Sequence, residues 1–575
     1  MINRVTLRYF KRFQAETFDI SNSIILAGPN NTGKTTLLQA IAVWHLVLRK
    51  WLEERGPESG SKARERTGVA ITRQAFTTIP LREMNLLWID RSTGLHKDEL
   101  RAGQQLGTPR LVEIGVEGET AGKSWTLTFE FTYRYPDLIH VRPAKKDTPV
   151  EPILDVVRNL QVVHVPPFSG IGAEETRYDK AFQDLLIGQG KSGDILRNLL
   201  LEICRDRPAE WAELRRDIKD TFDYDLLPPV YNGLPYIVCE YRASDQKNSP
   251  KLDISCAGSG FLQLLMLLGF FYARPASILL LDEPDAHLHI ILQKQMYDRL
   301  REIARRRGCQ LLIATHSEVL VESTSPEQII SFFDHPHRLV DDTQRDQVRE
   351  ALKRLTSLDL LLAEQSPGIL YLEGETDLNL LREWARVLEH SVYQFFIENP
   401  FWHNNQGRHP REARAHFFAL KATKPLLKGI LILDGDNRQL PEQELSADGL
   451  TLLRWKRYEA ENYLIHPEVL SRFVQGERPD LFTTSAAKEG LNYLKKQLPP
   501  AVYEDPLGDH DYLTVTPASK TLLPGFFQAA GLPLTKNEYY QIASQMKPDE
   551  IPFEVKQKLD WIGEVLGLVK KRAGH

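Results

Sequence analysis

The first stretch of this sequence that could do chemistry is Gly28-Pro29-Asn30-Asn31-Thr32-Gly33-Lys34-Thr35, which fits the pattern G-x-x-x-x-G-K-[ST]. The backbone N–H groups of such a loop can surround phosphates, and the Lys34 ammonium can neutralise the β- and γ-phosphates. The Thr35 hydroxyl can ligate Mg²⁺. The pattern therefore predicts a site for ATP and Mg²⁺. Its expected nucleotide-binding residues are Gly28, Asn30, Asn31, Thr32, Gly33, Lys34, Thr35 and Thr36.

Two carboxylates and a histidine follow apolar runs further along the chain. Asp282 and Glu283 come after the apolar residues 278–281, which predict a parallel strand buried on both faces. Open α/β sheets place their chemistry at the carboxyl edge. We therefore expect Asp282 to hold the metal ion and Glu283 to polarise the attacking water. His316 ends the next apolar run and is expected to sense the γ-phosphate, with a purely structural histidine as the alternative.

The segments around these residues have the order strand, loop and helix that a phosphate-binding loop requires. Residues 23–27 predict a strand before the loop, and residues 36–42 predict a helix after it. A Gly-rich turn, Gly258-Ser259-Gly260, precedes a strongly apolar helix just before the Asp282 strand. Together these features resemble the ABC-type ATPases of the structural-maintenance and recombination class, in which a Gly-rich signature turn stands at this place.

This resemblance implies a composite site. In such ATPases the signature turn of one protomer completes the ATP site of another, because the N-terminus of its helix points at the γ-phosphate. Gly258, Ser259 and Gly260 would play that part here, with Ser255 as the other candidate for the signature serine. The turn departs from the commoner Leu-Ser-Gly-Gly-Gln form, and a flexible turn is the alternative. The resemblance predicts head-to-tail homo-oligomers that close on ATP. Gln161 is the candidate for the Q-loop glutamine.

Acidic residues follow two further apolar runs in the second half of the chain. Residues 369–372 lead into Glu373, with Asp377 close behind, and residues 429–433 lead into Asp434-Gly435-Asp436. Two buried parallel strands would bring these acids to one sheet edge, where like charges are tolerable only with bound cations. A surface run of acids is the alternative.

These residues resemble the Toprim fold of topoisomerases, primases and overcoming-lysogenisation-defect nucleases. The resemblance implies that Glu373, Asp434 and Asp436 are catalytic and bind metal together with Asp377. In residues 455–464 it implies a second metal ligand, Glu461 or Glu459, and a catalytic cation, Lys456. Two Mg²⁺ or Mn²⁺ ions held in this way could activate water and stabilise the leaving oxygen of a phosphodiester. The expected metal ligands of the chain are Thr35, Asp282, Glu373, Asp377, Asp434, Asp436 and Glu461.

The order of the two modules resembles antiviral defence nucleases of the overcoming-lysogenisation-defect, Gabija and PARIS types. It predicts an ATP-binding, metal-dependent nuclease that cuts DNA or RNA, with a protein partner of a defence system as a further expectation. The alternative is an ATPase scaffold or sensor that binds a partner or nucleic acid without cutting. Pure DNA repair is disfavoured, since the sequence has no sustained heptads for long coiled-coil arms.

Composition restricts the class of protein. The 575 residues are 42% hydrophobic and 26% charged, as in multidomain globular proteins. The net charge of −5 requires that any nucleic-acid contact come from a local basic surface. The 4 cysteines include no C-x-x-C pair, which favours a reducing cytoplasm over disulfides or a zinc site. We expect no secretory leader, because residues 1–6 run into an amphipathic strand. We also expect no membrane segment, because the most apolar run is too short for a bilayer.

The expected fold class is α/β, in four parts. Residues 1–340 would form the ATPase head with an antiparallel β-lobe and a helical insertion at about 175–225. Residues 341–366 would form a helical linker, residues 367–470 a Toprim-like domain, and residues 471–575 a helical region without assignable chemistry. The basic cluster 305–307 is expected to cap a helix, with a DNA contact as the alternative. The polar, aromatic and basic residues 402–411, followed by Arg414 and His416, predict either a phosphate-gripping loop or a solvated insertion.

Overall fold

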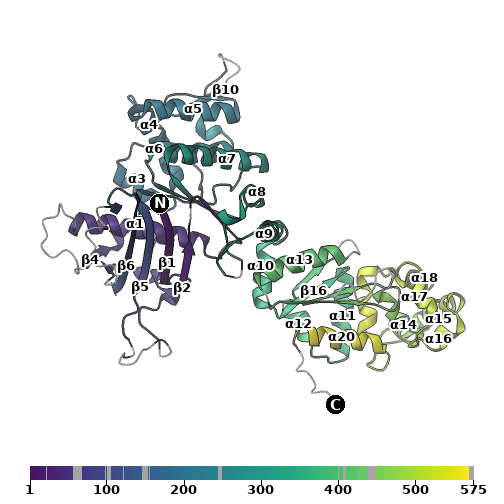
Figure 1. The fold of residues 1–575 in the computed structure, drawn as a ribbon. Coiled ribbons are helices and arrows are strands. Elements are labelled where there is room, and N and C mark those ends of the chain that lie inside the picture. Colours follow the sequence, from purple (N-terminus) through teal and green to yellow (C-terminus); the bar gives the residue numbers. More distant parts are fainter. Residues whose placement is uncertain are drawn as a thin grey trace. The chain divides into compact units, whose positions relative to one another are not determined.

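The computed structural model describes residues 1–568 with gaps at 21, 56–67, 97–98, 100–104, 106, 121, 145–152, 154–155, 244–248, 334, 399, 406–409, 425 and 437–448. The chain forms two compact units, residues 1–353 and 354–575 (Figure 1). The four-part division expected from the sequence is finer than this and stays a prediction.

No helix in the described part of the chain is long and apolar enough to cross a membrane.

A mixed sheet positions the nucleotide motifs in the first unit. Its strand order is β15-β14-β3-β13-β12-β8, and the central strands are parallel. The central strands at residues 24–27, 278–282 and 310–315 are short, largely apolar and fully buried, which is typical of parallel strands covered on both faces. The strands are β3 (Ile24–Ala27), β8 (Val162–Val165), β12 (Ile278–Asp282), β13 (Gln310–Thr315), β14 (Ile329–Ser331) and β15 (His337–Arg338).

An antiparallel sheet with the order β2-β1-β5-β6-β7-β4 forms the predicted β-lobe. Apolar and polar residues alternate along its strands, so one face of each strand is buried. Helix α1 (Lys34–Arg55) supplies much of the core that this sheet shares with the mixed sheet. Its Trp44 ring stacks on Trp125 at 5.9 Å and its indole N–H donates to the carbonyl oxygen of Leu127 at 2.9 Å. The strands are β1 (Ile2–Phe10), β2 (Phe13–Asp19), β4 (Val69–Thr72), β5 (Val112–Thr120), β6 (Lys123–Tyr135) and β7 (Leu138–Pro143).

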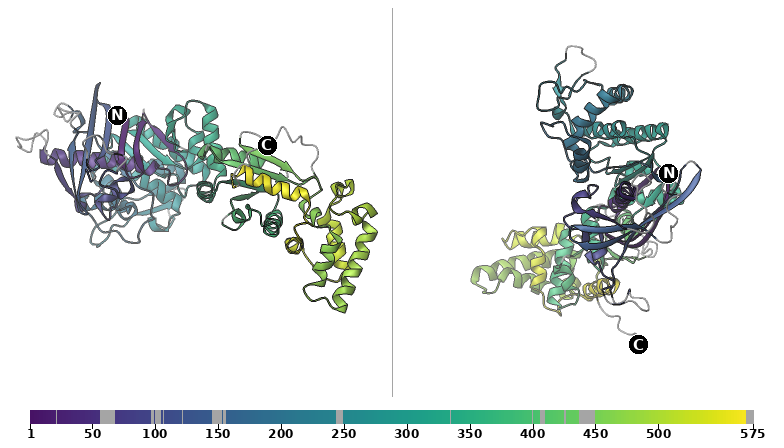
Figure 2. Two further views of the ribbon diagram at one scale, coloured as in Figure 1. Left: turned by 90° about the horizontal axis from the view of Figure 1, so that it is seen from below. Right: turned by 90° about the vertical axis from the view of Figure 1, so that its left-hand side faces the viewer.

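Helices and one small sheet form the rest of the first unit (Figure 2). The predicted insertion contains helices, and a small sheet with the order β11-β10-β9 follows it. Arg307, in the basic cluster, donates to the carbonyl oxygen of Phe271 at 2.8 Å and lies over the Tyr272 ring, so it caps a helix end. The elements are α3 (Lys180–Gly188), α4 (Leu196–Asp206), α5 (Pro208–Phe222), β9 (Tyr224–Leu226), β10 (Glu240–Ala243), β11 (Leu252–Asp253), α6 (Ser259–Ala273), α7 (Ile290–Arg307), α8 (Glu318–Glu322) and α9 (Asp342–Arg354).

The second unit is built on a parallel sheet with the strand order β17-β16-β18-β19. The C-terminal helices share one hydrophobic core with this sheet, because residues from 370 to 566 pack in a single cluster. The elements are α10 (Ser357–Gln365), β16 (Gly368–Leu372), α11 (Glu375–Val387), α12 (Tyr393–Ile397), β17 (Trp402–Asn404), α13 (Pro410–Thr423), β18 (Lys428–Leu433), β19 (Leu450–Arg454), α14 (Pro467–Gln475), α15 (Leu481–Gln497), α16 (Pro500–Glu504), α17 (Asp511–Val515), α18 (Leu523–Ala529), α19 (Tyr540–Ser544) and α20 (Phe553–Val565).

The segment expected as a phosphate-gripping loop is partly regular structure. Residues 402–404 form β17, and helix α13 begins at Pro410, while residues 406–409 lie outside the described part. His416 is buried, and its Nδ1 lies 2.9 Å from the Tyr371 hydroxyl. This histidine is therefore a core residue, and the structure does not support a phosphate-gripping role for it.

Candidate functional site

The phosphate-binding loop joins β3 to α1, and Lys34 is the first residue of the helix. Asn31 and Gly33 have positive φ angles of 62° and 113°, which turn the loop back on itself. A Cβ atom at Gly28 would lie 2.9 Å from the Cβ atom of Phe332, closer than van der Waals contact allows. Both glycines of the motif are therefore required by the backbone and its surroundings.

The Lys34 ammonium is buried inside this loop. It donates hydrogen bonds to the carbonyl oxygens of Gly28, at 2.6 Å, and Pro29. Burial lowers the pKa of Lys34 to about 8, against the raising effect of Glu283 and Asp282. The ammonium is thus hydrogen-bonded to neutral carbonyl groups. Phosphate oxygens accept hydrogen bonds more strongly, so a bound phosphate could replace these partners.

The two expected Mg²⁺ ligands of the nucleotide site are in direct contact. The Thr35 hydroxyl donates to Oδ1 of Asp282 at 3.0 Å, although the residues are 247 positions apart in the sequence. Strands β12 and β13 are parallel neighbours, and β13 pairs with β3, which brings both motifs to one sheet edge. Burial raises the pKa of Asp282 to about 6, while the Thr35 hydrogen bond lowers it.

Glu283 and His316 form a pair beside this contact. Nδ1 of His316 lies 3.6 Å from Oε1 of Glu283. Each raises the charged fraction of the other, since Glu283 raises the pKa of His316 and His316 lowers the pKa of Glu283. Glu283 also has a φ of 49°. Uncommon backbone conformations of this kind cluster at functional sites. The pair presents one carboxylate and one imidazole where the sequence analysis expected a base and a phosphate sensor.

Two further residues of this site were not found in the sequence analysis. The Arg12 guanidinium, in the turn between β1 and β2, donates to the carbonyl oxygen of Asn31 in the loop. Asp285 is buried at 1% exposure, and burial raises its pKa. The run Asp-Glu-Pro-Asp could have indicated Asp285, but nothing in the local sequence points from Arg12 to the loop.

The signature turn opens helix α6. Gly258 precedes the first turn, and Ser259 is exposed at the first helical position. The alternative serine, Ser255, is engaged locally, because its hydroxyl donates to Oδ1 of Asp253 at 2.7 Å. Gln161 precedes β8, and Val162 pairs with Ile278 at the amino end of β12. It therefore lies at the sheet edge opposite Asp282, and the structure does not support it as a Q-loop residue.

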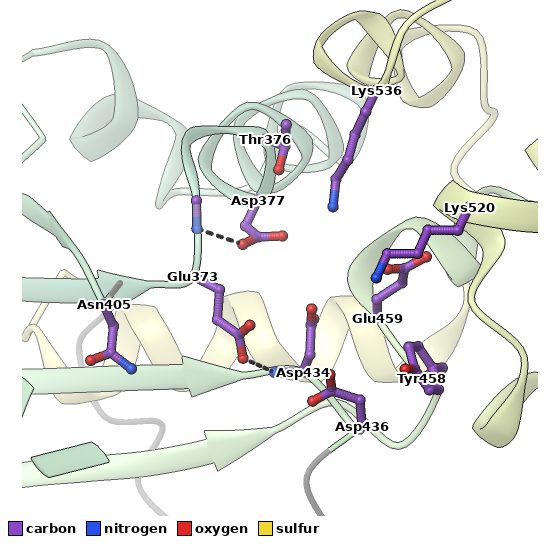
Figure 3. Close-up of a pocket in the computed structure, with 11 residues that line it drawn as sticks. Glu373, Thr376, Asp377, Asn405, Asp434, Asp436, Tyr458, Glu459, Lys520 and Lys536 are labelled. Atoms are coloured by element: carbon purple, nitrogen blue, oxygen red, sulfur yellow. Dashed lines mark hydrogen bonds between the residues drawn. The ribbon is translucent and has the colours of Figure 1, made fainter. Parts of the chain in front are cut away.

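The second candidate site is a pocket in the second unit with a volume of about 440 Å³, which we call the acidic pocket (Figure 3). It contains five carboxylates and two lysines. Its lining residues are Glu373, Gly374, Thr376, Asp377, Asn405, Asp434, Asp436, Tyr458, Glu459, Lys520 and Lys536. The structure thus brings five of the acids expected from the sequence into one place, and of the two candidates for the second metal ligand it is Glu459, not Glu461, that lines the pocket.

The parallel sheet explains this convergence. Glu373 directly follows β16, and Asp434 directly follows the neighbouring strand β18. Gly435 is needed between the two aspartates, because a Cβ atom there would lie 2.1 Å from the carbonyl oxygen of Arg457. The close approach of the Arg457 backbone also brings the segment with Glu459 to this edge.

Hydrogen bonds from the protein hold these carboxylates. Oε1 of Glu373 accepts from the backbone N–H of Asp434 at 2.9 Å, and Oδ2 of Asp377 accepts from that of Gly374 at 3.0 Å. Oε1 of Glu459 accepts from the backbone N–H of Ser519 at 2.5 Å. The C-terminal helical region, to which no chemistry was assigned, therefore contributes directly to the pocket.

The pocket carries more negative charge than its lysines offset. Burial and then Glu461 raise the pKa of Asp377 to about 8. Burial and then Asp377 raise the pKa of Asp434 well above its usual range. Carboxylate oxygens are the ligands that Mg²⁺ and Mn²⁺ prefer, so the donor set fits such a cation. As the described side chains lie, no three His, Cys, Asp or Glu residues converge into a complete cation cage. Cation binding would therefore require some carboxylates to turn from their protein donors.

Lys456 does not place its ammonium group in this pocket. Its side chain is 66% exposed, and its ammonium lies 3.6 Å from a carboxylate oxygen of Asp509. Lys536 lines the pocket instead, and its ammonium lies 2.8 Å from Oε1 of the buried Glu461. Lys520 is the second lysine of the pocket. Both come from the C-terminal helical region, whose sequence carries no motif.

We expect Lys536→Met to destabilise the second unit. The change leaves the carboxylate of Glu461, which is 1% exposed, without its ion-pair partner. Since Lys536 is itself half-exposed, the free energy of unfolding should fall by about 1–3 kcal/mol. Lys456→Met, as the matched control, should change it by less than about 0.5 kcal/mol. Urea unfolding of both variants measures the difference, and equal effects would contradict this placement of Lys536.

Comparisons with known proteins support the nucleotide site. Residues 150–322, which include the Asp282 strand, match a family model described as "AAA domain, putative AbiEii toxin, Type IV TA system". A search of curated protein sequences found no match. Together with the loop geometry, the family match supports an AAA-like, P-loop ATPase fold in the first unit.

Solved structures of SMC head domains also show similarity, each at 14% sequence identity. An SMC head bound to the C-winged helix domain of ScpA has a TM-score of 0.35 and covers 60% of this chain and 99% of its own. The SMC head from Thermotoga maritima has a TM-score of 0.30 and covers 59% and 99%. An Smc head bound to the C-terminal domain of ScpA, derived from Pyrococcus furiosus, has a TM-score of 0.32 and covers 57% and 92%.

Proposed function

We propose that this protein is an ATP-regulated nuclease. The first unit binds and hydrolyses ATP, and the acidic pocket cleaves a phosphodiester of DNA or RNA with bound Mg²⁺ or Mn²⁺. The observation that carries the proposal is the placement of Glu373 and Asp434 directly after neighbouring parallel strands, in one pocket with three further carboxylates. The AAA-like family match, whose description names a toxin of a toxin–antitoxin system, supports a setting in defence.

The residues of the pocket would divide the reaction among them. A bound divalent cation supplies a polarised water and stabilises charge on the phosphate. Glu373 and Asp434 would orient that cation, and the ammonium groups of Lys520 and Lys536 would attract the phosphate backbone into the pocket. Water attacks the phosphorus atom and one P–O ester bond breaks, which leaves a phosphate monoester and a hydroxyl group.

Cleavage assays test this function directly. Purified full-length protein is incubated with supercoiled plasmid or with transfer RNA, in Mg²⁺ or Mn²⁺, with and without ATP. We expect one of the polymers to be cut, with a rate that depends on ATP. If neither polymer is cut under any nucleotide condition and no divalent cation binds outside the ATP site, the nuclease proposal is wrong.

The second candidate is an ATPase scaffold with a pocket that does not cut. It is favoured by the ion pair between Lys536 and Glu461, which already neutralises one of the expected metal ligands. It is also favoured by the hydrogen bonds that turn Glu373 and Asp377 toward backbone N–H groups. Such a protein would bind a partner or nucleic acid without hydrolysing it.

The ATP site is proposed to be completed by a second copy of the chain. Ser259 is exposed at the start of α6, where a helix N-terminus can meet a phosphate. Lys34→Ala and Ser259→Arg should each abolish hydrolysis. An equimolar mixture should recover about a quarter of the wild-type rate, because half of the dimers are mixed and each has one intact site.

Subunit exchange is the control for this mixture. Labelled subunits must be shown to exchange before the rates are compared. If exchange is complete and the mixture hydrolyses ATP no faster than either parent, completion between copies is wrong.

A further inference from the structure

Asn405 follows β17 in the same way that Glu373 follows β16. Leu372 and Asn404 are register partners in these parallel strands, and the backbone N–H of Asn405 donates to the carbonyl oxygen of Leu372 at 2.8 Å. Asn405 and Glu373 are therefore the next pair along, on the same face of the sheet. With Asp434 after β18, three adjacent strands each place one oxygen-bearing side chain directly beyond their last residue.

The Asn405 side chain is buried, and the part of the chain that the structure describes leaves its amide unsatisfied. It is 2% exposed, and neither Oδ1 nor Nδ2 has a hydrogen-bond partner among the described residues. Leaving a buried amide unsatisfied destabilises the fold, so such a group in a pocket indicates a ligand that completes it. Asn405 lines the acidic pocket, where Figure 3 shows it on the strand side, near Glu373.

We infer that the side-chain oxygen of Asn405 is a neutral ligand of the divalent cation in the acidic pocket. The inference rests on the proposed nuclease function, since that function supplies the cation. The pocket has five carboxylates and two lysines, so a further anionic group would add repulsion in the empty pocket, which a bound cation would relieve. An amide oxygen adds a ligand without adding charge, and Mg²⁺ and Ca²⁺ sites use such oxygens.

The alternative is that the amide Nδ2 group donates to a phosphate of the substrate. The two roles differ in their response to Asn405→Asp, which keeps the shape and the oxygen but removes the N–H donors. If the oxygen binds the cation, the aspartate binds it at least as tightly. If the nitrogen binds phosphate, the aspartate repels the substrate and leaves cation binding unchanged.

Calorimetric titration of the nucleotide-free, full-length protein with Mn²⁺ tests the inference. The heat of Mn²⁺ binding that is lost in Glu373→Gln belongs to the acidic pocket, because this variant removes one charge from the cation site. Asn405→Ala should weaken Mn²⁺ binding roughly 10- to 100-fold, and Asn405→Asp should keep or tighten it. Asn404→Ala is the matched control, since the neighbouring side chain of a strand points to the opposite face, and it should bind Mn²⁺ like the wild type.

Thermal unfolding provides a second readout without activity. Without Mn²⁺, Asn405→Ala should unfold at the wild-type temperature or above, because the amide makes no hydrogen bond to the residues that the structure describes. With Mn²⁺, its melting temperature should rise less than that of the wild type, since ligand stabilisation follows affinity. If the alanine variant does not fold, Asn405→Leu replaces it, because leucine is close to asparagine in size but has no oxygen ligand, and it should show the same weakened Mn²⁺ binding.

Three results would overturn the inference. One is an Asn405→Ala protein that binds Mn²⁺ as tightly as the wild type. Another is an Asn405→Asp protein whose Mn²⁺ affinity is clearly weakened. The third is a wild-type pocket that binds no divalent cation, and this result would refute the proposed nuclease function as well, whereas the first two would leave that function standing.

Discussion

Glu373→Gln and Asp434→Asn will each lose nucleic-acid cleavage by roughly 100-fold or more, because each removes a charged oxygen from the cation site of the acidic pocket. ATP binding and hydrolysis should persist, since the phosphate-binding loop belongs to the other compact unit. Gel assays on plasmid and transfer RNA measure the cleavage, and phosphate release measures the hydrolysis.

The same variants should fold as well as the wild type. A glutamine at position 373 can still accept the backbone N–H of Asp434, so the strand-end contact survives. The raised pKa of Asp434, caused by burial and by Asp377, shows that its ionised form is penalised in the fold. Replacing that carboxyl group with an amide should therefore leave the unfolding free energy unchanged or raise it, as is common at functional sites. A variant that cleaves like the wild type would remove its residue from the catalytic set.

The second large effect is expected in the nucleotide site. Lys34→Ala removes the buried ammonium of the loop, and the loss of such a charge partner costs about 2–5 kcal/mol of binding free energy. This corresponds to an ATP affinity roughly 30- to 4,000-fold weaker. Glu283→Gln should bind ATP within a few-fold of the wild type, because the loop and the contact between Thr35 and Asp282 remain intact.

Hydrolysis separates these variants from each other. Glu283→Gln should hydrolyse ATP about 100- to 10,000-fold more slowly, since an amide cannot accept the proton of the attacking water. Lys50→Ala is the matched control on helix α1, because the Lys50 ammonium pairs with Glu53 at 2.8 Å, outside the loop. Binding of a fluorescent ATP analogue and phosphate release measure the two steps. Equal loss of nucleotide binding in Lys34→Ala and Glu283→Gln would refute the division of roles.

The acids at the carboxyl edges of the parallel strands could be predicted from the sequence. Short apolar runs predicted the strands before Asp282, Glu373 and Asp434, because a parallel strand that is buried on both faces must be apolar throughout. The acid that follows such a run is fixed at the sheet edge by chain connectivity alone. The phosphate-binding loop is predictable for the same reason, since its strand, turn and helix are contiguous in the sequence.

Charge compensation in the acidic pocket was not predictable. The sequence analysis expected Lys456 there, but that side chain points to Asp509, while Lys536 approaches Glu461 from a distant helical segment. Residues 455–464 have only a short 3₁₀ turn, so no strand or helix period indicates which side chains face the pocket. The choice between the lysines depends on how the C-terminal helices pack.

The sequence by itself determined the nucleotide-binding loop, the strands that carry the acids and the α/β class of both units, because each of these follows from local patterns of apolar and polar residues. Only the tertiary structure decided that Arg12 contacts the loop, that Lys520 and Lys536 line the acidic pocket, and that the Asn405 amide is buried there with no hydrogen bond to any described residue. These positions depend on contacts between segments far apart in the chain, and a contact of that kind leaves no periodic signal in the sequence of either segment.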